Sequence, residues 1–90
     1  MIPGNIVQTD ILKAIEWLNN NGTAHDALIE DNLVVFGNRT YPVSQLLSVA
    51  NTFANGEFLD ISRLQERGQE VAKLLTQLGF QIKAQNMAGS

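Results

Sequence analysis

Apolar residues recur at three- and four-residue spacing in three stretches of this chain, which is the period of a helix with one buried face. In the first stretch, Ile11, Ile15 and Leu18 fall on one side of such a helix. Thr9 is suited to cap it, because its hydroxyl can accept a hydrogen bond from an early helical N–H. The pattern therefore predicts a helix over residues 10–20.

The second stretch predicts a central helix over residues 42–55. Pro42 suits its first turn, where the missing N–H of proline is not needed. The pair Asn55-Gly56 supplies a stop signal. The apolar stripe of this helix consists of Val43, Leu46, Leu47, Ala50, Phe53 and Ala54.

The third stretch ends at Gly79, a residue suited to a helix C-terminus. Its apolar face consists of Val71, Leu74, Leu75 and Leu78. Further upstream, Ser62 and Gln65 have the spacing of a capping box, which favours an early start for this helix. Gly68 supports a second interpretation, since an internal glycine costs a helix about 1 kcal/mol relative to alanine. In that interpretation residues 61–67 form a separate turn.

Two short runs of β type flank the dipeptide Gly37-Asn38, namely residues 33–36 and residues 39–41. A two-residue loop of this kind predicts a β-hairpin, because Gly and Asn accept the positive φ angles of its turn. Residues 80–82 alternate as a strand that can pair with the hairpin. Residues 23–32 fit either a short helix or a strand.

Together these elements predict one winged-helix-like α+β domain, with a small antiparallel sheet of hairpin and C-terminal strand packed against three main helices. The domain is expected to span residues 1–83, followed by a flexible tail over residues 84–90. Trp17 lies at the edge of the first helical stripe and is either a rim residue of the core or an exposed contact for a partner. The core is expected to include Phe36, Phe53, Phe58 and Phe80.

The composition narrows the class of protein. Of the 90 residues, 44% are hydrophobic and 17% are charged, which argues against intrinsic disorder, and no apolar run reaches the roughly 20 residues of a membrane span. The chain has no cysteine, and its first ten residues lack the pattern of a secretory signal. We therefore expect a cytoplasmic protein. The net charge of −3 argues against a surface that attracts nucleic acid everywhere, but it does not determine the charge of any one local patch.

The residues that carry chemistry are few. His25 is the single histidine and is expected to be an exposed loop residue. With no cysteine and no second histidine a zinc site cannot be completed, and the acidic residues within 26–31 do not form a calcium loop. Ser44 and Ser48 lie one turn apart without a base to activate either. We expect no cofactor, no metal and no enzymatic activity.

Several short motifs occur in a set order along the chain. Ile11-Leu12 and Ala14-Ile15 come first, in the predicted opening helix, and residues 35–42 of the predicted hairpin follow. The apolar helix to Gly56 comes next, and then residues 78–82, which join the last predicted helix to the last strand. This succession, from Thr9 to Ile82, resembles the N-terminal head domain of McrA-type (ScoMcrA-like) HNH restriction endonucleases, which recognise modified DNA. The resemblance implies a non-catalytic DNA-binding accessory domain whose partner is double-stranded DNA, modified or unmodified.

The hairpin motif of that family usually leads into a Tyr-Pro-Pro-Lys-like sequence. The chain keeps Gly37, Arg39, Tyr41 and Pro42 of this motif. It has Val43 and Ser44 where the family usually has proline and lysine, and the resemblance implies that Gly68 is what remains of a later glycine pair. The missing lysine and glycine are groups suited to binding phosphate. We therefore expect this chain to share the fold of the family more completely than its DNA binding. The residues expected to contact DNA are Arg39 at the hairpin tip, with Thr40, Tyr41, Ser44, Arg63, Arg67 and Lys73.

A second class of function is a protein-interaction module, such as a dimerisation or adaptor domain or a small phage-type inhibitor. The acidic balance and the lack of catalytic groups favour it. The residues expected to contact the partner, either another protein or a second copy of the chain, are Trp17, Leu28 and Ile29.

Overall fold

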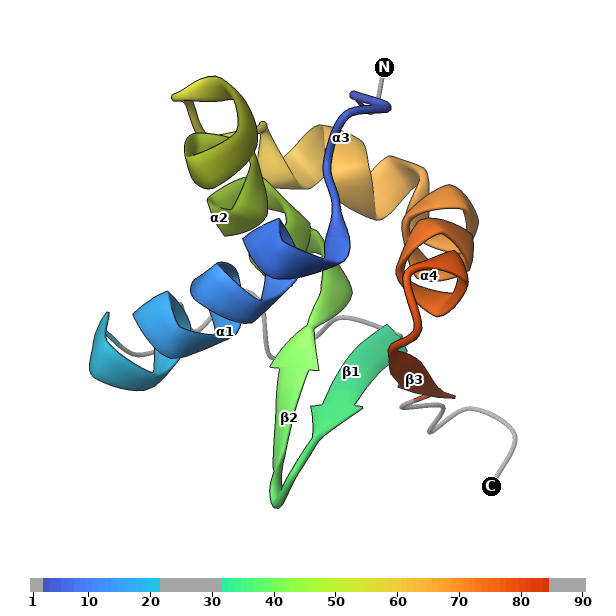
Figure 1. Ribbon diagram of the computed structural model, residues 1–90. Coiled ribbons are helices and arrows are strands. Elements are labelled where there is room, and N and C mark those ends of the chain that lie inside the picture. The colour runs from blue at the N-terminus through green and yellow to red at the C-terminus, as the bar shows by residue number, and fades with distance from the viewer. Residues whose placement is uncertain (1–2, 22–31, 85–90) are drawn as a thin grey trace.

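The computed structural model describes residues 3–21 and 32–84, and Figure 1 shows how their helices and strands are arranged. The expected α+β class is confirmed: helices pack on a small antiparallel sheet. The elements are, in chain order, α1 (Gln8–Asn21), β1 (Asn32–Phe36), β2 (Arg39–Pro42), α2 (Val43–Asn55), α3 (Ile61–Glu66), α4 (Gly68–Gln77) and β3 (Gln81–Ala84).

The strands form one antiparallel sheet in the order β2-β1-β3, so the C-terminal strand pairs with the hairpin as predicted. The hairpin turn has two residues, of which Gly37 has a positive φ of 63° and Asn38 does not. The prediction of positive φ at both turn residues is therefore wrong for Asn38, and the turn has the glycine-first pattern of type II′. Val34 pairs with both Tyr41 and Ile82, and this row faces the helices.

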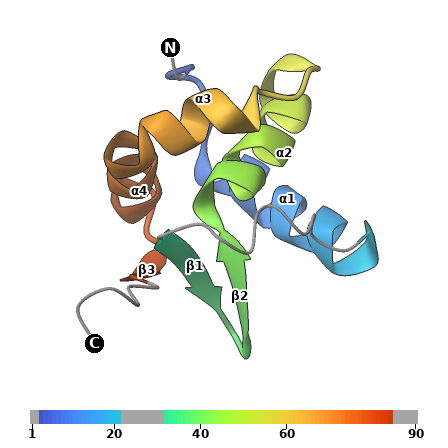
Figure 2. The ribbon, with the colours of Figure 1, turned by 180° about the vertical axis from the view of Figure 1, so that it is seen from behind.

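Helix α2 is the centre of the fold. Every residue from Val43 to Asn51 is buried. Helix α1 packs along it, and α3 and α4 cover it from other directions. Figures 1 and 2 show α1 and α4 on opposite sides of the molecule, with α3 at one end and the hairpin projecting at the other. Fully burying one leucine such as Leu46 or Leu47 contributes about 1.5–3 kcal/mol, so the predicted stripe is the main anchor of the domain.

Two buried polar side chains of α2 fix the connection that follows it. Ser48 Oγ donates a hydrogen bond to the Leu59 carbonyl at 2.6 Å, and Asn51 Nδ2 donates one to the Glu57 carbonyl at 2.8 Å. Buried polar groups are tolerated when they find such partners. The two bonds hold the chain against α2 and so set where α3 begins.

Both helix starts that rest on a predicted serine or threonine cap need correction. Helix α1 begins at Gln8, so Thr9 lies inside it, and the start is closed by Asp10, whose Oδ2 accepts from the Val7 N–H at 3.1 Å. Helix α3 is capped by Asp60, whose side chain accepts from the Ser62 N–H at 2.9 Å. Aspartate is at least as good a cap as serine or threonine. Asp10 lies one residue after the predicted cap Thr9, and Asp60 lies two residues before the predicted cap Ser62.

Residues 61–66 form a helix of their own, separated from α4 at Arg67. The second interpretation of this region is confirmed in the separation, but it predicted a turn where the structure has a helix. Helix α4 ends in a Schellman motif. The Gly79 N–H donates to the Thr76 carbonyl and the Phe80 N–H to the Leu75 carbonyl, both at 3.0 Å, with Gly79 at a φ of 97°. The predicted role of Gly79 as the helix stop is confirmed.

The prediction that all four phenylalanines lie in the core is wrong for three of them. Phe80 is 7% exposed, but the exposed fractions of Phe36, Phe53 and Phe58 are 43%, 42% and 59%. These three stand at the end of β1, in the last turn of α2 and in the connection after it, where the core no longer surrounds them. Trp17 is half-buried and packs against the core, which matches a rim residue.

Residues 22–31 and 85–90 lie outside the described part of the chain. The predictions for His25, for the partner contacts Leu28 and Ile29, and for most of the tail fall there. Of the helices within residues 3–21 and 32–84, none is long and apolar enough to cross a membrane.

Candidate functional site

The side chain of Arg39 is held at the hairpin by the last turn of α1. Arg39 is the first residue of β2, opposite Phe36, and is exposed. Its Nη1 donates a hydrogen bond to Asn19 Oδ1 at 3.2 Å. The same oxygen accepts from the Tyr41 hydroxyl at 2.5 Å. A guanidinium group whose orientation is set by Asn19 therefore lies at the end of the sheet that projects from the molecule.

The sheet and its turn carry no carboxylate. Their two charged residues are Arg39 and Lys83, both basic and exposed. The pairing register places Lys83 opposite Leu33, three positions along β1 from the residue that pairs with Arg39, and on the other face of the sheet. Among the described residues, the sheet is thus an element group with basic side chains and no acidic ones.

The other predicted contacts near the hairpin differ in accessibility. Thr40 is exposed and pairs with Val35, so it points to the face opposite Arg39. Tyr41 is 4% exposed and Ser44 is fully buried. The expectation that Tyr41 and Ser44 contact DNA is not supported, because burial leaves them no surface to offer. They build the junction between β2 and α2.

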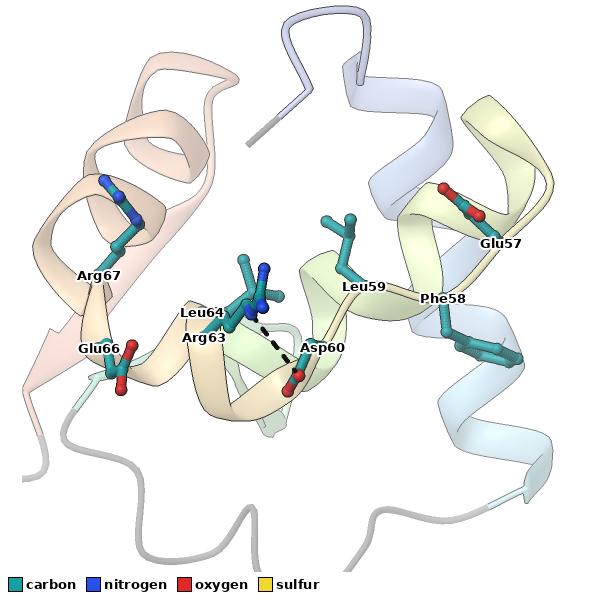
Figure 3. Close-up of a pocket in the computed structure, with 8 residues that line it drawn as sticks. All are labelled: Glu57, Phe58, Leu59, Asp60, Arg63, Leu64, Glu66 and Arg67. Atoms are coloured by element: carbon teal, nitrogen blue, oxygen red, sulfur yellow. Dashed lines mark ion pairs between the residues drawn. The ribbon is translucent and has the colours of Figure 1, made fainter. Parts of the chain in front are cut away.

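A shallow pocket of about 440 Å³ lies along α3 and the segment before it. Figure 3 shows Leu59 and Leu64 in its middle, with Arg63 paired to Asp60. The lining consists of Glu57, Phe58, Leu59, Asp60, Arg63, Leu64, Glu66 and Arg67. Three carboxylates thus stand among its two guanidinium groups.

Both arginines of this pocket have acidic partners. Arg63 Nε lies 4.0 Å from Asp60 Oδ2, and Arg67 Nη1 lies 3.2 Å from Glu70 Oε1. These side chains are more than half exposed, so each pair contributes little to stability. The pairs nevertheless lower the positive potential that a phosphate group would meet at α3.

The seven predicted DNA contacts therefore do not form one surface. Arg39 and Thr40 lie at the hairpin, while Arg63 and Arg67 lie at α3, the opposite end of the molecule in both views (Figures 1 and 2). Lys73 is exposed on a third element, α4.

An aromatic surface lies along α1 and the end of α2. The rings of Trp17 and Phe58 meet edge to face with centroids 6.1 Å apart, and the Lys13 ammonium lies 6.0 Å from the centre of the Phe53 ring. Phe53 and Phe58 were expected in the core, so this surface was not predicted as a unit. Trp17 was the one member expected to be available to a partner.

Asn19 and Lys83 are the residues that the sequence analysis missed. Asn19 belongs to a run of asparagines that signals a helix end, which gave no reason to single it out. Lys83 has no local signal that singles it out, since the pairing of β3 with β1 is needed to place it on the sheet. No group of three or more metal-ligating side chains occurs among residues 3–21 and 32–84.

The chain matches the family described as "ScoMcrA-like, N-terminal head domain" over residues 4–84, and it belongs to that family. It is therefore a domain related to restriction endonucleases, as the hairpin and helix motifs suggested. No curated protein and no solved structure matches it.

Proposed function

We propose that this domain is a non-catalytic DNA-binding accessory module of a modification-dependent restriction endonuclease, and that it contacts the duplex with its hairpin end. The observation that carries the proposal is the exposed Arg39 guanidinium, held by Asn19 at the end of a sheet without carboxylates. The membership of a head-domain family related to restriction endonucleases supports the same conclusion.

Electrostatics favours the hairpin over the other basic sites. Phosphate contacts supply most of the affinity of proteins for DNA and come chiefly from arginine and lysine. Arg63 and Arg67 already lie beside acidic side chains, whereas Arg39 pairs with a neutral amide. Among the described residues, no carboxylate paired with Arg39 therefore lowers the positive potential that it presents to an incoming phosphate.

The shape of the hairpin suits a groove. A two-stranded β-ribbon fits the major groove of B-DNA, which is about 12 Å wide. Arg39 and Thr40 point to opposite faces of this ribbon. An inserted hairpin would therefore present the guanidinium to one wall of the groove and the hydroxyl to the other, with the turn at Gly37 and Asn38 between them.

We also propose that the domain lacks catalytic activity and acts in the cytoplasm, where it meets DNA. One histidine and no cysteine are available in the whole sequence, so hydrolysis would need groups from elsewhere. The role of the domain would then be to position a nuclease on its duplex.

The test is a fluorescence-anisotropy titration of labelled duplexes, unmodified and cytosine-methylated, against the wild type, Arg39→Ala and Arg63→Ala. The two variants lose the same charge at opposite ends of the molecule, so they control for each other. We expect Arg39→Ala to weaken binding by about fivefold or more and Arg63→Ala to change it little. Absence of binding by the wild type at low salt would overturn the proposal.

A protein-interaction module is the second candidate, favoured by the exposed ring of Phe58 beside Trp17 and by the exposed ring of Phe53 beside Lys13. Aromatic residues dominate the binding energy of many protein interfaces. Light scattering over a range of protein concentrations tests this candidate. It would be favoured if the molar mass of the wild type doubled with concentration, the mass of Phe58→Ala stayed that of a monomer, and the wild type bound no DNA.

A further inference from the structure

Asn19 of α1 makes side-chain hydrogen bonds to two residues of the hairpin. Its Oδ1 accepts from Arg39 Nη1 at 3.2 Å and from the Tyr41 hydroxyl at 2.5 Å. We infer that Asn19 is the positioning residue that orients the Arg39 guanidinium for DNA. The inference rests on the proposed function and deepens it, because it names the residue on which the contact made by Arg39 depends.

The orientation of the Arg39 guanidinium depends on a residue of the core, Tyr41. Tyr41 is 4% exposed and stands opposite Val34 in the row that faces the helices, so its ring cannot turn freely. Its hydroxyl is therefore a fixed donor. A carbonyl oxygen has two lone pairs and can accept two hydrogen bonds at once. Tyr41 thus fixes the side-chain amide of Asn19, and the second lone pair of that oxygen is left for Arg39.

The benefit for binding is entropic. A free arginine side chain has about 2 kcal/mol of rotamer entropy, and ordering such a side chain on binding lowers affinity. In this domain the ordering has already taken place on folding. The C-terminal end of α1 adds a favourable partial negative charge near the guanidinium. The bond to Asn19 uses one of the five N–H donors of Arg39, and the others have no protein partner among the described residues.

The first experiment compares Asn19→Ala with Asn20→Ala, which removes the neighbouring exposed amide of the same helix. Duplex binding is measured by anisotropy over a series of salt concentrations. We expect Asn19→Ala to weaken binding about two- to tenfold at an unchanged salt slope, because Arg39 keeps its charge but loses its direction. We expect Asn20→Ala to bind as the wild type does, and Arg39→Ala to lower the salt slope by about 1.

The outcomes separate the inference from the proposed function. If Arg39→Ala weakens binding and Asn19→Ala does not, the positioning role of Asn19 is overturned and the proposed function stands. If Arg39→Ala has no effect, the proposed function fails and the inference fails with it. In an Arg39→Ala background, Asn19→Ala is expected to have no further effect on binding.

A second readout needs no DNA. In the free protein, the NMR order parameter of the Arg39 Nε–H is expected to fall in Asn19→Ala and to stay unchanged in Asn20→Ala. An Arg39 side chain that is equally ordered in both variants would overturn the inference. If Asn19→Ala does not fold, Asn19→Asp keeps an acceptor for Arg39 and Tyr41. That variant should keep Arg39 ordered while its carboxylate offsets the charge, so that affinity and salt slope both fall.

Discussion

The indole ring of Trp17 and the phenyl ring of Phe58 meet edge to face, with centroids 6.1 Å apart and ring planes at 65°. Trp17 belongs to α1, and Phe58 belongs to the connection between α2 and α3. The pair therefore fastens that connection to the first helix. Edge-to-face aromatic pairs contribute about 0.5–1.5 kcal/mol beyond the burial of their area.

Replacing Phe58 is expected to be visible in the fluorescence of Trp17, the single tryptophan of the chain. Phe58→Leu should lower the free energy of unfolding by about 1 kcal/mol and shift the emission to longer wavelength, because water reaches the indole ring. Phe53→Leu is the control, since Phe53 contacts Lys13 instead. Equal emission spectra of Phe58→Leu and the wild type would contradict the contact.

The two glycines at the ends of α4 should respond to alanine in opposite directions. Gly79 has a φ of 97°, and a Cβ there would lie 3.3 Å from Gln8 Nε2. Gly79→Ala is therefore expected to lower the stability by about 1–2 kcal/mol. Gly68 begins α4 with open space around it and no positive φ, so Gly68→Ala should be neutral or stabilise by up to about 1 kcal/mol. Urea denaturation of both variants measures the contrast, and equal midpoints would contradict it.

Asp10 closes the start of α1 from inside the helix. Asp10→Ala removes the acceptor of the Val7 N–H and a favourable charge in the first turn, so the stability should fall by about 1 kcal/mol. For a domain of this size that corresponds to a melting temperature lower by roughly 4–8 °C. Glu16→Ala removes an exposed carboxylate from the same helix and should have little effect. Similar melting temperatures for the two variants would show that Asp10 is not the cap.

Asn51 holds the connection between α2 and α3 against α2 through a side-chain hydrogen bond to the Glu57 carbonyl. Asn51→Ala removes the side-chain donor to the Glu57 carbonyl and one acceptor of the Asn55 side chain, which keeps its bonds to Asn5, and the stability should fall by about 1–3 kcal/mol. Calorimetry gives the loss, with Thr52→Ala as control, since Thr52 returns its hydroxyl to the carbonyl of Val49 in its own helix. Amide exchange in α3 should accelerate in Asn51→Ala and not in the control.

The elements of this fold could be predicted where a pattern repeats or a backbone requirement is local. The stripe of α2, the glycine at residue 79 and the two-residue turn each carry their own signal in sequence. The caps could not be assigned in the same way, because Thr9 and Asp10, or Asp60 and Ser62, offer the same chemistry one or two residues apart. The prediction of burial was wrong for Phe36, Phe53 and Phe58, because hydrophobicity indicates a preference for burial but not whether the core reaches that position.

The candidate site was predicted only in part because it depends on contacts distant in sequence. Arg39 could be placed at a hairpin tip from local pattern, but its partner Asn19 lies 20 residues away. The arginines of α3 were grouped with it by charge alone. Their acidic partners are three residues away on the same helical surface, a spacing that sequence reveals once the helices are known.

The central claim is that DNA contacts the hairpin end, and NMR mapping of the backbone amides during titration with a short duplex tests it most directly. We expect the largest shift changes at Gly37, Asn38, Arg39 and Thr40, with smaller ones at Asn19 and Lys83, and little change over α3. Changes centred on residues 63–67, or none at low salt, would contradict the account.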